Sequence, residues 1–217
     1  MLRLTPIVKN LIILNVIVFF FLNLIMMGIL PISPRVVNFF VLHHNNYLGL
    51  WPMPAGANAF HPIQLVTSFF SHLDLFHILF NMLALASLGT SMEMVMGPRR
   101  FLRMYLFAGV FAGLMITFFD PMYGGVVLGA STAISGVLAA YAVQFPSTPL
   151  SFFFLPPISA RKLVIGVAVI SAVLVGVQML GRDMGGLGRI SHFGHLTGIV
   201  GGVLYFWLEK RLPFLRN

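Results

Sequence analysis

Cysteine is absent from this 217-residue chain, and charged residues are scarce. The lack of cysteine excludes disulfide bonds, thiolate metal sites and a cysteine nucleophile. Asp, Glu, Lys and Arg together make up 8% of the residues, whereas they make up about a quarter of an average soluble domain. So little charge cannot cover the surface of a soluble globular protein. The 59% share of hydrophobic residues excludes a disordered chain as well.

The hydrophobic residues that dominate the sequence occur in long unbroken runs. A transmembrane β-barrel would instead alternate apolar and polar residues over segments of about ten residues. A helix that spans a bilayer needs about 20 mainly apolar residues. We therefore predict an all-α polytopic membrane protein, with six transmembrane helices in a single membrane domain over residues 1–217. The predicted spans are residues 10–30, 75–96, 101–119, 128–145, 163–180 and 192–208.

The 13 basic residues, which give the chain a net charge of +8, lie mostly between these runs. All but Arg35, Arg182 and Arg189 fall on one side of the membrane if the six spans alternate in direction. The positive-inside rule then places both termini in the cytoplasm. No basic stripe with interleaved aromatic residues is present, so we expect a lipid bilayer and no nucleic acid as partner. The compact plan predicts the inner (cytoplasmic) membrane of a bacterium.

Polar side chains inside three of the predicted spans are the informative exceptions, because such residues are rare in a bilayer and mark functional sites. His77 and Asn81 are four residues apart in the second span, and therefore share one helix face. Ser131 follows Gly129 near the start of the fourth span, and His195 lies near the start of the sixth. These three spans run inward from the outer side, so the side chains are expected at one shallow depth.

A serine, a histidine and a pair of hydrogen-bond donors at one depth fit acyl transfer. One group attacks a carbonyl, one accepts the proton, and the donors stabilise the oxyanion. Gly198 and Gly202 share a face with His195 and let a neighbouring helix approach closely, as a serine–histidine hydrogen bond requires. No third acid is apparent, because the acidic residues lie at span edges, in loops or near the cytoplasmic end of the second span. The pattern therefore favours a dyad of Ser131 and His195 over a triad.

At these residues the chain resembles the rhomboid family of intramembrane serine proteases. The similarity covers Pro62–Trp207, about two thirds of the chain, and rests on four motifs in the family's order. Those motifs are H-x4-H-x3-N at His72–Asn81, acidic-x3-Gly at Glu93–Gly97, G-x-S at Gly129–Ser131 and H-x2-G-x3-G at His195–Gly202. Each motif is weak alone, and the four in order are specific.

The resemblance implies a fold, an activity and a set of site residues. It implies a six-helix rhomboid-like bundle that acts as a serine endopeptidase, cleaving transmembrane proteins near the outer membrane interface without a cofactor or metal. Ser131 would be the nucleophile and His195 the general base. His77, Asn81 and the backbone N–H of Ser131 would form the oxyanion hole. The loop between the first two spans would lie partly in the membrane, beside the active site.

Three positions depart from the family's pattern. The family usually has Gly after the nucleophile, where this chain has Thr132, and often an aromatic residue four positions after it, where this chain has Ser135. Trp-Arg or Trp-Gln often precedes the second helix, where this chain has Ile63-Gln64. Thr132 adds bulk near the nucleophile, and Ser135 leaves His195 without a stacking partner. We expect both to affect the rate rather than the class of reaction.

Other interpretations of the same residues remain open. Ser131 alone could bond back to a carbonyl one turn earlier, as serines in membrane helices do, and His77 with Asn81 could merely tie helices together. A metal site at His72 and His77, or at His192 and His195, lacks a carboxylate to complete it. An alternative function is a catalytically inactive rhomboid-like protein that binds membrane helices. A small transporter is disfavoured, because no internal repeat is present.

Overall fold

The computed structural model describes residues 3–43, 60–120, 126–150, 156–181, 188 and 190–212, and all structural statements below refer to these residues. Arg182, Arg189 and Arg216, whose charges bear on the predicted orientation, lie outside them. The long helices are α1 (Pro6–Met26), α5 (Pro98–Phe119), α6 (Ser131–Gln144), α7 (Ala160–Met179) and α8 (His192–Arg211). The shorter elements are the 3-10 helices η1 (Pro34–Phe40) and η2 (Ser68–Phe70), the helices α2 (Gln64–Thr67), α3 (Leu75–Ala84) and α4 (Thr90–Met96), the π-helical segment η3 (Leu85–Gly89), and the strands β1 (Leu42–His43), β2 (Val126–Val127), β3 (Pro149–Leu150) and β4 (Ile158–Ser159).

Four helices of the described chain are long and apolar enough to cross a membrane. They are α1, the continuous α3–η3–α4 helix, α5 and α7. Many of their large apolar side chains are exposed, among them Phe76 and Phe80 on α3 and Val169 and Ile170 on α7. Apolar surface of this extent needs lipid around it, so the chain is a helical membrane protein. The fourth and sixth predicted spans correspond to α6 and α8, and for these two the crossing stays a prediction.

Three of the helices begin earlier than the predicted spans, α3 and α8 begin where predicted, and α6 begins three residues later. Helices α1 and α5 start at Pro6 and Pro98, and α7 starts after Ser159, whose side chain accepts a hydrogen bond from the Lys162 N–H. Proline is well suited to the first helical position, and a serine cap begins a helix independently of hydrophobicity. The predicted spans begin only after the charged residues, whereas in the structure basic residues such as Lys9 lie within the first turns of the helices.

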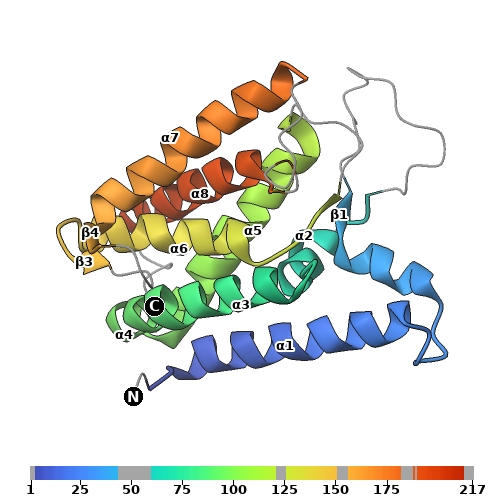
Figure 1. The fold of residues 1–217 in the computed structure, drawn as a ribbon. Coiled ribbons are helices and arrows are strands. Elements are labelled where there is room, and N and C mark those ends of the chain that lie inside the picture. The colour runs from blue at the N-terminus through green and yellow to red at the C-terminus, as the bar shows by residue number, and fades with distance from the viewer. Residues whose placement is uncertain are drawn as a thin grey trace.

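The centre of the bundle is α6, which packs against α5 and α8, while α1 and α7 lie on opposite sides (Figure 1). Helices α3, α6 and α8 begin at the same end of the bundle, on the right in Figure 1. The antiparallel ribbon of β1 and β2, which pairs Leu42 with Val127, lies at that end too. The start of α1 and the end of α8 lie at the opposite end.

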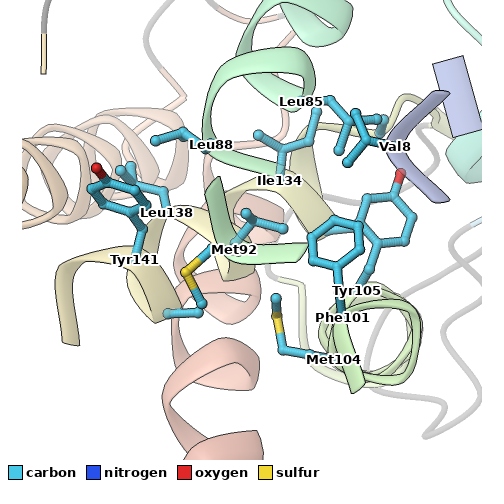
Figure 2. Packing of buried hydrophobic residues seen from close by; sticks show 14 of the residues in the cluster. Val8, Leu85, Leu88, Met92, Phe101, Met104, Tyr105, Ile134, Leu138 and Tyr141 are labelled. Atoms are coloured by element: carbon cyan, nitrogen blue, oxygen red, sulfur yellow. The ribbon is translucent and has the colours of Figure 1, made fainter. Parts of the chain in front are cut away.

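A cluster of buried apolar side chains fills the space between α1, α4, α5 and α6 (Figure 2). Met92 from α4 packs with Phe101 and Met104 from α5, and Leu138 and Tyr141 extend the cluster along α6. All but three of the 14 residues of α6 are buried. The core therefore holds α6 on every side and fixes the place where this helix begins.

Glu93, to which the sequence assigns no catalytic role, joins α4 to the start of α1. Its carboxylate accepts hydrogen bonds from Thr5 Oγ1 at 2.6 Å, the Ile7 N–H at 3.0 Å and the Val8 N–H at 2.9 Å. The first N–H groups of a helix have no partner within the helix, and a negative charge is favourable there. Glu93 is thus the cap of α1, supplied by another helix.

An ion pair joins α5 to α8 at the end opposite the starts of α3, α6 and α8. Arg100 donates from Nε and Nη2 to the two carboxylate oxygens of Glu209, each at 2.8 Å. Two parallel charge-assisted hydrogen bonds fix both distance and orientation. The pair holds the two helices that border α6 at a set separation.

Candidate active site

Ser131 is the first residue of α6, and a tight turn after β2 leads into it. Within that turn Gly129 has a φ of +112°, and its N–H donates to the Ser68 carbonyl at 2.9 Å. Only glycine adopts such a φ without strain. A methyl carbon added at Gly129 would lie 2.7 Å from His77 Nε2 and 3.9 Å from Ser131 Oγ. The turn therefore needs glycine both for its conformation and for the close approach of His77.

His77 is held by its own helix so that one ring nitrogen is available to the site. Asp74 caps α3 by accepting the His77 N–H at 2.8 Å, and the Leu73 N–H donates to His77 Nδ1 at 3.4 Å. A neutral imidazole whose Nδ1 accepts carries its proton on Nε2. Nε2 is the atom against Gly129, so a donor N–H lies beside the turn that carries Ser131.

His72 packs against His77 from the loop that precedes α3. The two rings meet edge to face, with 4.9 Å between their centroids. Burial, and to a smaller extent the neighbouring His77, lowers the pKa of His72 to about 3, so this ring is neutral at physiological pH. Because the His72 ring is uncharged, it supports the orientation of His77 and does not repel a positive charge on the His77 ring.

Asn81 lies one turn further along α3 and is buried. Its Nδ2 donates to the His77 carbonyl at 2.8 Å. That bond uses one of the two amide hydrogens and leaves the other available. No hydrogen bond joins Asn81 to Ser131 or His195 among the described residues, so the structure brings Asn81 to the helix of His77 but not into a bond with the serine.

Helices α6 and α8 touch backbone to backbone next to the site. A methyl carbon added at Gly198 would lie 2.1 Å from the Thr132 carbonyl oxygen, and one at Gly202 would lie 2.2 Å from the Gly136 carbonyl oxygen. Carbon–oxygen contacts in proteins are rarely shorter than about 3.3 Å. Any side chain at Gly198 or Gly202 would therefore push the helices apart.

This packing places His195 at the level of Ser131. Thr132, the next residue after Ser131, contacts both Gly194 and Gly198, which flank His195 on α8. The His192 and His195 rings are perpendicular, with 6.3 Å between their centroids. No hydrogen bond joins Ser131 Oγ to His195 within the described part of the chain. Catalytic hydrogen bonds are often long before substrate binds.

Two of the three departures from the family's pattern have a structural explanation. The Ser135 hydroxyl donates to the Ser131 carbonyl at 2.8 Å, so the bond back along the helix is made by Ser135. Thr132 is only 4% exposed, and its methyl group lies where a side chain at Gly194 would be, 2.9 Å from an added carbon. The expected bulk of Thr132 therefore lies in the interface between α6 and α8, and Gly194 provides the room for it.

At the third departure, Ile63-Gln64, the glutamine belongs to a polar stripe that sequence reasoning missed. Gln64, Thr67 and Ser71 donate to the three successive carbonyls of Asn38–Phe40, with 2.8 Å for the bond from Gln64. These bonds fasten the described part of the loop that follows α1. The signal in the sequence is the spacing of the three polar residues, which places them along one side of a helical segment.

A metal centre finds no support in the described residues, where no three histidine or acidic side chains come together. The His72 and His77 rings pack edge to face. The centroids of the His192 and His195 rings are further apart, at 6.3 Å. The donors that do converge, His77 and the turn of Ser131, are of the kind that stabilises a developing oxyanion.

Comparison with known proteins identifies relatives in eukaryotes and in a bacterium. Rhomboid protein 1, mitochondrial, of Saccharomyces cerevisiae is 31% identical over 67% of this chain and 41% of its own length. The human presenilin-associated rhomboid-like protein, mitochondrial, is 32% identical over 65% of this chain and 36% of its own. Rhomboid protease GluP of Bacillus subtilis is 30% identical over 64% of this chain and 24% of its own.

The chain therefore spans less than half the length of the curated relatives that it matches. Two of these three relatives are mitochondrial, so the comparisons do not support the predicted bacterial inner membrane. What they do support, together with the apolar helices, is a membrane location.

A family model, the rhomboid domain, matches residues 59–211. The match takes in every element from α2 to α8 and leaves α1 outside. It includes the helix of His77 and Asn81, the turn of Ser131 and the helix of His195. A match over more than half of the chain, with these residues in the family's order, means that the chain belongs to the rhomboid family.

Proposed function

We propose that the chain is an intramembrane serine endopeptidase that cleaves transmembrane proteins near the outer membrane interface. Membership of the rhomboid family supports the class of reaction. The observation that carries the proposal is the convergence of His77 Nε2 and Ser131 Oγ on the turn at Gly129. A nucleophile and an oxyanion donor must meet at a single carbonyl group for acyl transfer to occur.

In the proposed reaction Ser131 Oγ attacks the scissile carbonyl carbon, and His195 accepts the hydroxyl proton. The negative charge that forms on the carbonyl oxygen is stabilised by the His77 Nε2–H, the free amide hydrogen of Asn81 and the backbone N–H of Ser131. This last group is unpaired within α6 and lies at the positive end of the helix dipole. The amine then leaves with the proton from His195, and a water molecule hydrolyses the acyl ester.

The length of α6 bears on how water reaches Ser131. Its 14 residues span about 21 Å, whereas the hydrocarbon core of a bilayer is about 30 Å thick. If the end at Gln144 lies at the cytoplasmic surface, Ser131 lies below the outer surface. Water must then enter from the outer side, between the starts of α3, α6 and α8.

This arrangement assumes six spans with both termini in the cytoplasm. Reporter fusions test it directly. A fusion after the last residue and one between Arg99 and Arg103 should read as cytoplasmic. A fusion near residue 183, outside the described residues, should read as external. The inverted pattern would put Ser131 on the cytoplasmic side and contradict the proposed cleavage site.

The substrate class follows from the hydrogen bonds of a membrane helix. A transmembrane helix satisfies all its backbone groups internally, so its scissile carbonyl is hidden until the helix frays. Gly and Pro make fraying easier, since they are about 1 and 3 kcal/mol worse than Ala in a helix interior. A single-span model substrate whose outer-end Gly and Pro are replaced by Leu should be cut more slowly. Equal cleavage of both versions would exclude fraying as the basis of selection.

The decisive experiment is labelling of the purified protein by a fluorophosphonate probe, alongside cleavage of a model substrate. The wild-type protein should react in both assays, and Ser131→Ala should react in neither. His195→Ala should lose nearly all turnover. If the folded wild-type protein is neither labelled nor active, the proposed activity is wrong and the chain is an inactive family member.

A further inference from the structure

Helix α5 carries a notch that receives the segment leading to α3. Gly109 and Gly113 lie one turn apart on α5. A methyl carbon added at Gly109 would lie 2.4 to 2.9 Å from three ring atoms of Phe69, and one at Gly113 would lie 3.0 Å from Leu65 Cδ2. Leu65 and Phe69 are themselves four residues apart, so these two side chains rest directly on the two glycines.

The residue between these two anchors that matters for the site is Ser68. Its carbonyl accepts the Gly129 N–H at 2.9 Å, and Gly129 is the residue against which His77 Nε2 packs. Phe69, the immediate neighbour of Ser68, is only 2% exposed. A short path of contacts therefore runs from the α5 backbone at Gly109, through Phe69 and Ser68, to the turn that carries the proposed nucleophile.

The same segment is fastened on its other side as well. The polar stripe of Gln64, Thr67 and Ser71 binds the carbonyls of Asn38–Phe40, and β1, two residues later, pairs with β2. Strand β2 leads directly into Gly129. Residues 64–71 therefore hold the Gly129 turn in two ways. One is the hydrogen bond to the Ser68 carbonyl, and the other runs through Asn38–Phe40 and the ribbon of β1 and β2.

We propose that residues 64–71 are a positioning element for the nucleophile, with Phe69 and Gly109 as the positioning residues that set its height on α5. In the described part of the chain no hydrogen bond joins these residues to the side chains of Ser131, His77 or His195. The element acts by fixing Gly129, and through it the distance between Ser131 Oγ and His77 Nε2. The inference rests on the proposed role of Ser131, but the contacts that carry it do not depend on that role.

Gly109→Ala is the perturbation of choice. Carbon atoms in contact prefer separations of about 3.5–4.0 Å, so the added methyl group would displace the Phe69 ring by about 1 Å. A displacement of that size at reacting groups can cost about 10²-fold in rate. Gly113→Ala should cost less, because the atom that it meets is the end of a flexible leucine side chain.

The test combines two readouts on the full-length protein in detergent micelles. The first is hydrogen–deuterium exchange of the peptide that contains Gly129, whose N–H bonds to Ser68. The second is the rate of fluorophosphonate labelling at Ser131. Gly109→Ala should speed the exchange about 10-fold and slow the labelling about 10²-fold. Gly166→Ala is the matched control, because an added methyl group there meets nothing within 4 Å.

Rescue separates positioning from general instability. Replacing Phe69 by the smaller leucine in the Gly109→Ala background should restore labelling at least 10-fold and slow the exchange again. The proposal is overturned if Gly109→Ala leaves the exchange of the Gly129 peptide unchanged, or if Phe69→Leu restores thermal stability without restoring the labelling rate. If Gly109→Ala speeds the exchange of the Gly129 peptide but the wild-type protein is never labelled, the role of Ser131 is contradicted. The coupling between Gly109 and Gly129 is then still supported.

Discussion

Replacing Gly198 by alanine tests whether the approach of α6 and α8 sets the catalytic geometry. The added carbon would lie 2.1 Å from the Thr132 carbonyl oxygen, whereas carbon–oxygen contacts are rarely shorter than about 3.3 Å. The contact is with backbone, which cannot rotate away, so the helices must separate by about 1 Å. Because Thr132 follows Ser131 and Gly198 lies one turn after His195, the separation opens the distance between the proposed nucleophile and base.

Two effects should follow from Gly198→Ala. The overpacked interface should lower the free energy of unfolding by about 1–3 kcal/mol. A shift of about 1 Å between reacting groups should lower kcat by about 10²-fold, with a smaller change in KM, because Gly198 is buried between α6 and α8. The assay is cleavage of a single-span substrate in proteoliposomes, with thermal unfolding measured on the same preparations.

Gly176→Ala on α7 is the control, since an added methyl group there meets nothing within 4 Å. It should change neither kcat nor stability for the worse, because alanine is the better helix former by about 1 kcal/mol. A folded Gly198→Ala protein with kcat within about twofold of the wild type would refute the link between helix approach and catalysis.

Three further predictions concern single side chains. His77→Ala and Asn81→Ala should each lower kcat by about 10²–10³-fold if both groups donate to the oxyanion, and near-normal turnover in both would remove that assignment. Ser135→Ala should keep probe labelling, because the Ser135 hydroxyl is occupied with the carbonyl one turn earlier; loss of labelling in this variant alone would move the nucleophile. Glu209→Gln should lower the free energy of unfolding by about 2 kcal/mol. This is the lower end of the cost of removing one partner of a buried charge pair, and we expect the lower end because Arg100 reaches solvent. Unchanged thermal unfolding would show that the pair has no net effect on stability.

The candidate site can be assembled from the sequence because polar residues stand out in apolar spans. His77, Asn81, Ser131 and His195 are conspicuous for that reason alone, and the direction of the spans predicts that they lie at one end of the bundle. The starts of α3, α6 and α8 do lie at one end (Figure 1). The roles of these side chains in catalysis stay predictions.

Contacts between segments distant in the chain are beyond the reach of the sequence. The bulk of Thr132 is expected beside the nucleophile, because no pattern reveals that Gly194 makes room for it on another helix. The role of Ser68 escapes sequence reasoning, since its contribution is a backbone carbonyl, which every residue has. The π-helical segment η3 escapes it too, because nothing in the residues Leu85–Gly89 distinguishes a π-helical turn from an α-helical one.

The cap that Glu93 supplies to α1 has a consequence for the order in which the protein is completed. Chains are synthesised from the N-terminus, so α1 leaves the ribosome before α4, because Glu93 follows Thr5 by 88 residues. Until α4 is made, the first N–H groups of α1 must remain hydrated at the membrane surface. Helix α1 therefore gains these hydrogen bonds only after α4 has been made, and Glu93 then fixes α1 against the helices that follow it in the chain.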